Sequence, residues 1–266
     1  MDESQIKQMV RARYGSIATA AAAEAACCAP AASSCCGPTT ASRDKALRMG
    51  YSESDLALVG DGANLGLGCG NPQAIAAIRP GEIVVDLGSG AGFDCFLAAR
   101  QTGPAGRVIG VDMTHEMLAK ARDNAARMGA ANVEFRLGEL EHLPIADNSA
   151  DVVISNCVIN LVPDKPQVFR EAFRVLKPGG RLAVSDIVST APLPADLAAD
   201  PALICGCVAG AVTAAQAEQW LAAVGFTGIS VEVKPYSREL INSWGPEKGI
   251  ENYVVSATIE ARKPPR

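Results

Sequence analysis

Short apolar runs alternate with amphipathic segments through the middle of the chain. Short segments rich in apolar and β-branched residues are typical of strands, and we predict five of them: Ile83 to Leu87, Arg107 to Asp112, Val133 to Leu137, Asp151 to Asn156 and Leu182 to Ile187. Helical spacing of apolar residues lies between them, in Phe93 to Arg100, Thr114 to Met128 and Phe169 to Leu176. This alternation predicts an α/β fold, a doubly wound and mostly parallel sheet with right-handed crossovers, whose ligands bind at the carboxyl ends of the strands.

The two ends of the chain follow other patterns. Residues 2–14 have the spacing of a short amphipathic helix, and residues 16–43, rich in Ala, Ser and Cys, are expected to form a mobile loop. Beyond Pro192, residues 193–225 are predicted to be helical, followed by strands at Thr227 to Lys234 and Tyr253 to Ile259. We therefore divide the chain into an N-terminal helix with a cysteine-rich arm and glycine loop (1–72), a core (73–190) and a C-terminal segment that completes the sheet (191–266).

Composition narrows the class of protein. The 266 residues are 48% hydrophobic and carry a formal net charge of −5, so the chain can form a large core and has no basic surface for nucleic acid. The N-terminus lacks the apolar segment of a signal peptide, and no apolar run reaches the roughly 18 residues of a membrane span. We expect a cytoplasmic protein without nucleic-acid or membrane partners.

Nine cysteines are unusual for a cytoplasmic chain. A reducing compartment disfavours a disulfide framework, and a C-x-x-C zinc pattern is absent, so thiol chemistry or a soft ion is the better explanation. Two pairs, Cys27-Cys28 and Cys35-Cys36, fall in the arm. They either capture and pass on a thiophilic ion or belong to an unimportant flexible segment.

The turn after the first strand carries the candidate cofactor chemistry. Gly88, Gly90 and Gly92 form G-x-G-x-G, which lets backbone approach a ligand closely, and Asp86 brings a carboxylate that suits a cationic ligand. The stretch resembles the class I S-adenosylmethionine-dependent methyltransferases. In that superfamily the sheet has seven strands, of which the last two form an antiparallel pair.

The resemblance implies a cofactor site for S-adenosylmethionine that several segments build. Asp112 ends the second strand, where such folds place a ribose-binding carboxylate, although an acid there also suits the start of the next helix. Glu139 follows the third strand, where such folds line the adenine, and could equally be a solvated charge. The implied cofactor-binding residues are Asp86, Gly88, Ser89, Gly90, Gly92, Asp112, Met113 and Glu139.

Three further cysteines lie where the methyl acceptor should be. Cys69 sits in a glycine-rich loop, Cys157 ends the fourth strand, and Cys207 lies in the C-terminal segment two positions after Cys205. Cys95, in the middle of a helix, is expected to be an ordinary buried side chain. The surrounding motifs, GLGCGNP, SNCVINL and CVAGA, together with GVDMT, EHLP and the arm pairs, resemble those of arsenite methyltransferases.

This narrower resemblance implies trivalent arsenic held by Cys69, Cys157 and Cys207 and methylated stepwise, with glutathione or thioredoxin as the thiol reductant. Soft trivalent arsenic selects thiolate, and its lone pair is already a nucleophile, so no general base is needed. Cys205 could substitute for Cys207. The alternatives are a methyltransferase for a small organic acceptor, such as a quinone or sterol-like carbon, with incidental cysteines, and a non-enzymatic thiol module that sequesters metalloids.

Overall fold

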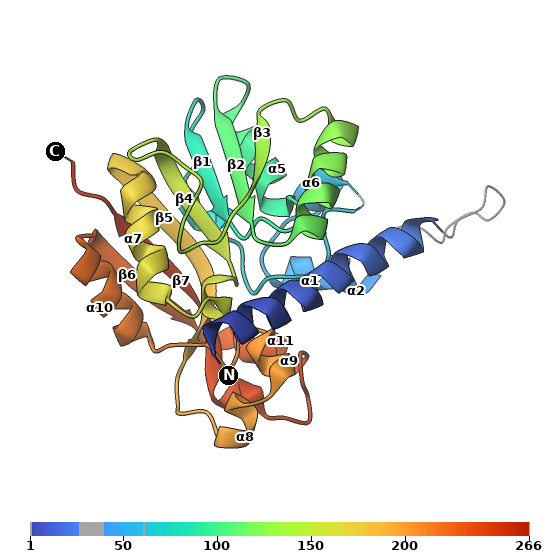
Figure 1. Ribbon diagram of the computed structural model, residues 1–266, viewed down its shortest axis with the longest axis vertical. Coiled ribbons are helices and arrows are strands. Elements are labelled where there is room, and N and C mark those ends of the chain that lie inside the picture. The colour runs from blue at the N-terminus through green and yellow to red at the C-terminus, as the bar shows by residue number, and fades with distance from the viewer. Residues whose placement is uncertain (1, 27–39, 61, 266) are drawn as a thin grey trace.

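A seven-stranded sheet organises the computed structural model, which describes residues 2–26, 40–60 and 62–265 (Figure 1). Its order is β3-β2-β1-β4-β5-β7-β6, parallel except for β7, which runs antiparallel to both neighbours. The strands are β1 (Ile83–Leu87), β2 (Arg107–Asp112), β3 (Val133–Leu137), β4 (Ala150–Asn156), β5 (Leu176–Ser189), β6 (Thr227–Lys234) and β7 (Val254–Arg262). The predicted α/β fold with an antiparallel end is confirmed.

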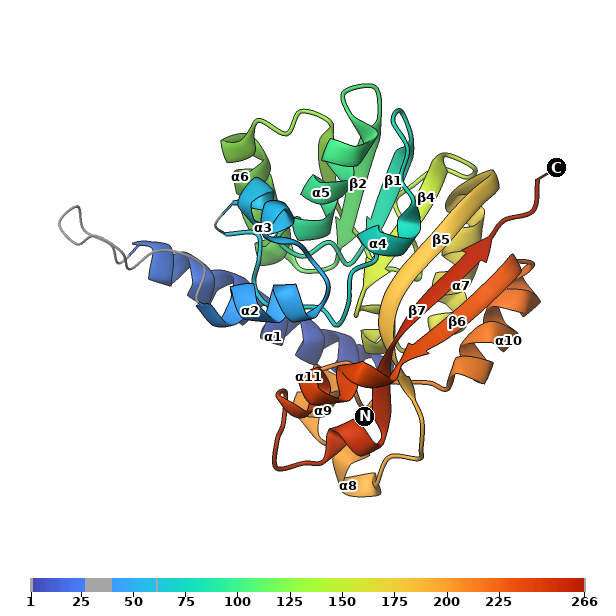
Figure 2. The ribbon, with the colours of Figure 1, turned by 180° about the vertical axis from the view of Figure 1, so that it is seen from behind.

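Helices cover both faces of this sheet because strand residues alternate between two cores. Val85 and Val153 pack toward α7 (Lys165–Val175) and α10 (Ala214–Val224). Val84 and Val152 pack toward the opposite face. That face, seen in Figure 2, is covered by α2 (Thr40–Arg48), α3 (Glu53–Val59), α4 (Gln73–Ala76) and α5 (Phe93–Thr102), with α6 (His115–Met128) at the end near β3.

The N-terminal region differs from the expectation. Helix α1 runs from Glu3 to Ala26, so the predicted loop over 16–43 is wrong for residues 16–26 and again from Thr40, where α2 begins. Alanine has the highest helix propensity, and the alanine-rich stretch that ends at Ala26 continues the helix. Cys27, Cys28, Cys35 and Cys36, the arm pairs, lie outside the described residues.

The C-terminal segment is less regular than the predicted helix over 193–225. It contains α8 (Ala195–Ala198), α9 (Pro201–Ile204) and α10, with non-helical backbone between α9 and α10. The short helices α8, α9 and α11 (Arg238–Asn242) gather beyond the carboxyl-end edge of the sheet, which α1 also crosses (Figures 1 and 2). Three 3₁₀ turns complete the described chain, at Ile159–Leu161, Pro235–Ser237 and Ile250–Asn252. Within the described residues, no helix is long and apolar enough to cross a membrane.

Candidate functional site

The three predicted cysteines meet in one buried cluster beyond the ends of β4 and β5. Cys69, Cys157 and Cys207 belong to the same apolar core, and each is at most 9% exposed. The sulfur atoms of Cys69 and Cys157 and a carboxylate oxygen of Asp186 lie within 4.8 Å of one another. The Cys207 thiol donates a hydrogen bond of 2.8 Å to the Cys157 carbonyl. We call Cys69, Cys157 and Cys207 the thiol cluster.

Two members of the thiol cluster occupy the left-handed backbone region. The φ angles are 57° at Cys157 and 66° at Cys207, a conformation that costs a non-glycine residue on the order of 1–3 kcal/mol. Surrounding contacts hold the Cys157 backbone in place, because its amide donates to the Ser185 carbonyl over 2.8 Å. The fold therefore sustains local strain at two of the three thiols, which is common at functional sites.

The three cysteines of the thiol cluster differ in the direction of their pKa shifts. The pKa of Cys157 lies well below its ordinary value because interactions with the neighbouring Cys207 and Cys69 side chains favour its thiolate form, with help from the Lys45 charge. The same interaction with Cys157 and burial raise the pKa of Cys207, while burial foremost raises that of Cys69. Cys157 is thus the member best suited to be the thiolate in the free protein.

The two remaining described cysteines have other partners. Cys205 is buried and its carbonyl accepts a hydrogen bond from the Tyr14 hydroxyl over 3.2 Å. Cys205 belongs to the same apolar core as the thiol cluster, but it is the Cys207 thiol, and not the Cys205 thiol, that donates a hydrogen bond to the Cys157 carbonyl. Cys95 is fully buried in α5, as expected, and its thiol donates to the Asp86 carboxylate over 3.1 Å.

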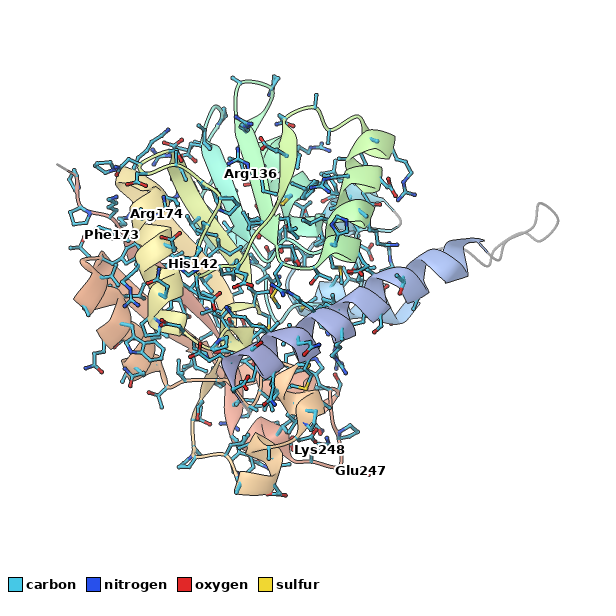
Figure 3. The ribbon with its side chains drawn as sticks, viewed as in Figure 1. Arg136, His142, Phe173, Arg174, Glu247 and Lys248 are labelled. Carbon is cyan, nitrogen blue, oxygen red and sulfur yellow. The ribbon has the colours of Figure 1, made fainter. Side chains whose placement is uncertain are left out.

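A cavity at the carboxyl ends of β1, β2 and β4 reaches the thiol cluster through Cys157. We call it the main cavity. Its lining includes most of the predicted cofactor-binding residues, namely Asp86, Gly88, Ser89, Gly90, Asp112 and Met113. Residues of α1, among them Val10 and Tyr14, line it from the other side. The loop after β3 also contributes, and Arg174 on α7 donates to the carbonyls of Leu143 and Ile145 in that loop (Figure 3).

The polar groups of the main cavity match the requirements of a nucleoside-bearing cation. Asp112 accepts hydrogen bonds from the Gly90 and Thr114 amides, at 2.9 and 2.7 Å, and each carboxylate oxygen keeps a lone pair for a ribose hydroxyl. The Ser89 hydroxyl is buried and has no hydrogen-bond partner in the described part of the chain. Burial raises the pKa of Asp86, and a nearby cation would favour its charged form. These residues fit S-adenosylmethionine.

Gly92 and Glu139, although predicted as cofactor ligands, do not line the main cavity. A Cβ at Gly92 would lie 2.8 Å from both Phe135 and Phe96, so this glycine allows α5 to pack against its neighbours. The Glu139 carboxylate pairs with Lys7 at 2.7 Å and with Arg11, both on α1. These ion pairs lower the pKa of Glu139 and fasten α1 beside the cavity. Gly138 and Leu140, on either side of it, line the cavity instead.

Asn156 links the main cavity to the thiol cluster, and sequence reasoning missed it. Its side chain accepts from the Cys69 amide at 3.1 Å and donates to the Gly70 carbonyl, the Tyr51 hydroxyl and the Asp94 carboxylate. Its place at the end of β4, directly before Cys157, was a signal that could have identified it. Asp94 and Tyr51 also line the cavity, and their pairing across distant segments left no sequence pattern.

Comparisons with known proteins agree with this geometry. A family model of a methyltransferase domain matches residues 78–225. An arsenite methyltransferase of Halobacterium salinarum is 52% identical over 269 residues, spanning all of this chain and 68% of the relative. An arsenite methyltransferase of Homo sapiens is 44% identical over 138 residues, spanning 48% of this chain and 37% of the relative. The crystal structure of an arsenic(III) S-adenosylmethionine methyltransferase from Chlamydomonas reinhardtii superimposes with a TM-score of 0.60 at 33% identity, covering 85% of this chain and 74% of the other.

Proposed function

The chain belongs to the arsenite methyltransferase family, and on this premise we propose that it transfers methyl groups from S-adenosylmethionine to trivalent arsenic held by Cys69, Cys157 and Cys207. One observation carries the assignment of these residues. Three thiols from separate segments converge in a buried cluster, and one of them, Cys157, also lines the main cavity. Soft trivalent arsenic prefers such a set of sulfur ligands to any oxygen or nitrogen set.

The residues of the main cavity bind and orient the methyl donor. Bound S-adenosylmethionine supplies an electrophilic methyl group attached to a sulfonium. Asp112 would accept hydrogen bonds from the ribose hydroxyls, and the Ser89 hydroxyl would gain in the ligand the hydrogen-bond partner that it lacks in the described chain. Asp86 would face the positive charge of the ligand. Met113 and the backbone of Gly88 and Gly90 would close around it.

The thiol cluster has to hold arsenic rather than activate it. Each thiol that binds arsenous acid forms a sulfur–arsenic bond as an arsenic–oxygen bond breaks, and the thiol proton leaves with the hydroxide as water. Cys157, with its lowered pKa, is already favoured as thiolate. Because the bound arsenic keeps a lone pair, the protein needs no general base, and its contribution is to align lone pair, methyl carbon and sulfonium for in-line displacement.

Further methylation requires a thiol reductant, which we propose to be glutathione or thioredoxin. Free thiols in this number are suited to a reducing compartment, so we place the reaction in the cytoplasm. Methylated arsenicals would be the products, which makes detoxification of arsenite the role of the protein. We also propose separate roles for the three chain segments. Residues 1–72 form the N-terminal helix, the cysteine-rich arm and the glycine loop, residues 73–190 bind S-adenosylmethionine, and residues 191–266 bind arsenic and complete the sheet.

Incubation of the purified protein with arsenite, S-adenosylmethionine and glutathione tests the function. We expect methylated arsenicals, separated by chromatography, to form together with S-adenosylhomocysteine. Omission of arsenite should stop cofactor consumption. Tight arsenite binding without methyl transfer would support the sequestering module instead, and transfer to a quinone but not to arsenite would support the organic acceptor.

A further inference from the structure

A second cavity reaches the thiol cluster from another side. It has a volume of about 340 Å³ and is lined by the loop of Cys69 and by β5, β6 and β7. Cys69 lines this second cavity and Cys157 lines the main cavity, while the two sulfur atoms lie within 4.8 Å of each other. The two cysteines therefore stand between two spaces, and each space is lined by a different one of them.

Several hydroxyl-bearing residues line the second cavity. The Ser185 hydroxyl is buried and has no hydrogen-bond partner within the described residues, and Ser185 itself is 2% exposed. Thr258, the partner of Ser185 across the β5–β7 pairing, lines the same space. Ser256, a third lining residue, donates from its hydroxyl to the Cys69 carbonyl over 2.9 Å. A buried hydroxyl without a partner is costly, and a ligand with its own hydroxyls would satisfy it.

The charged residues of the second cavity are neutralised. Arg48 pairs with Glu239 at 3.1 Å, and Lys234 pairs with Glu232 at 2.7 Å. The space therefore favours a small, neutral, hydroxyl-bearing molecule over an anion. Arsenous acid, the form of arsenite at neutral pH, is a neutral molecule with three hydroxyls on one arsenic atom.

We propose that the second cavity is the binding and entry site of arsenous acid, which reaches Cys69 there while the methyl donor occupies the main cavity. This inference rests on the proposed function. In the first step the Cys69 sulfur bonds to arsenic, one arsenic–oxygen bond breaks, and the thiol proton joins the departing hydroxide as water. The Cys207 thiol then displaces a second hydroxyl in the same way, and the Cys157 thiolate displaces the third, which leaves as hydroxide. The oxidation state of arsenic does not change, so no oxidant or reductant is involved.

Separate access makes the two ligands independent. A bound methyl donor fills the main cavity beside Cys157 and leaves the route to Cys69 open. Arsenous acid can therefore bind before or after the donor. A single shared entrance would instead require a fixed order, with the arsenical first.

Alkylation of the full-length protein by iodoacetamide, with each cysteine quantified by peptide mass spectrometry, tests the two routes. Ala74→Phe adds bulk at an exposed residue lining the second cavity, and Ala222→Phe, on the exposed side of α10, is the matched control. We expect Ala74→Phe to slow alkylation of Cys69 several-fold and to leave Cys157 unchanged. S-adenosylhomocysteine should protect Cys157 and not Cys69. Equal Cys69 rates in both variants, or protection of both thiols by S-adenosylhomocysteine, would overturn the proposal.

A second variant tests the hydroxyl directly. Ser185→Ala removes the unpartnered hydroxyl without removing a hydrogen bond from its described neighbours, so the fold should be retained. We expect the KM for arsenite to rise about fivefold, the effect of one hydrogen bond, with the KM for S-adenosylmethionine unchanged. An unchanged KM for arsenite contradicts the site. The labelling pattern does not depend on methyl transfer, so a protein that failed to methylate arsenite could still confirm the two routes.

Discussion

The glycine turn of the main cavity and the thiol cluster are built in opposite ways. The turn and its partner Asp112 come from one β-α-β unit, Ile83 to Asp112, and hydrogen bonds within this unit hold them: the Gly88 and Ser89 amides donate to the Val111 carbonyl, and the Gly90 amide donates to the Asp112 carboxylate. The thiol cluster draws on three segments, and Cys207 alone lies 50 positions after Cys157. One region is a property of a local sequence, and the other is a property of the whole fold.

This difference implies that the two ligand sites can be damaged separately. Substitutions in the thiol cluster should remove arsenic chemistry and leave donor binding, and substitutions in the turn should do the reverse. Asn156 and Asp94 lie between the two sites, so substitutions at either residue should impair both donor binding and arsenic chemistry.

Cys157→Ser should reduce arsenite methylation by about 100-fold or more, because the favoured thiolate is replaced by a hard hydroxyl and arsenic is misplaced relative to the methyl group. Chromatography of methylated arsenicals measures the loss. Calorimetry should find unchanged S-adenosylmethionine binding. Methylation within twofold of the unaltered protein would refute the role of Cys157.

Cys207→Ser and Cys205→Ser form a matched pair, because both residues are buried and lie in the same short segment. Only Cys207 contacts Cys157, so its replacement should lower methylation by about tenfold or more, whereas Cys205→Ser should stay within about twofold. Initial rates at saturating donor measure both. A larger loss in Cys205→Ser would mean that the two cysteines exchange roles during turnover.

Asp112→Asn should weaken S-adenosylmethionine binding by about tenfold, the effect of a lost charge-assisted hydrogen bond. The variant keeps the size of the side chain while removing the charge that the Gly90 and Thr114 amides face. Arsenite affinity, measured without donor, should not change. A parallel loss of arsenite affinity would show that the two sites are coupled after all.

Asp94→Asn should alter the pH dependence of stability. Burial raises the pKa of Asp94 to about 6, above the value of about 3.9 for an unfolded chain. A raised carboxyl pKa means that its stabilisation is complete below about pH 4 and is lost as pH rises through 6, by up to roughly 3 kcal/mol.

Urea unfolding at pH 4.5 and pH 7 measures this. The unfolding free energy of the unaltered protein should fall relative to that of Asp94→Asn as pH increases. Asp186, whose pKa is also raised by burial, is present in both proteins and cancels in the difference, whereas loss of the Asp94 charge also lowers the pKa of Asp86 and adds to the change. Parallel curves for the two proteins would contradict the assigned pKa shift.

Several features of the molecule followed from sequence alone, because they depend on neighbours along the chain. β2, β3 and β6 match the predicted bounds, since β-branched and aromatic residues between turn residues specify a strand locally. The glycine turn, Asp86 and Asp112 were recognisable for the same reason. The course of α1 beyond residue 14 was missed, although its alanine-rich stretch carried a local signal.

The tertiary structure decided which groups face one another. Spacing could not separate Cys205 from Cys207, and only the path of the chain after α9 turns Cys207 toward Cys157. Likewise Glu139 occupied a plausible position in sequence, yet Lys7 and Arg11 of a distant helix hold its carboxylate. Periodicity reports burial along a single element, whereas convergence of side chains depends on how several elements pack, and that packing brings three separated thiols into one buried core at the end of the sheet.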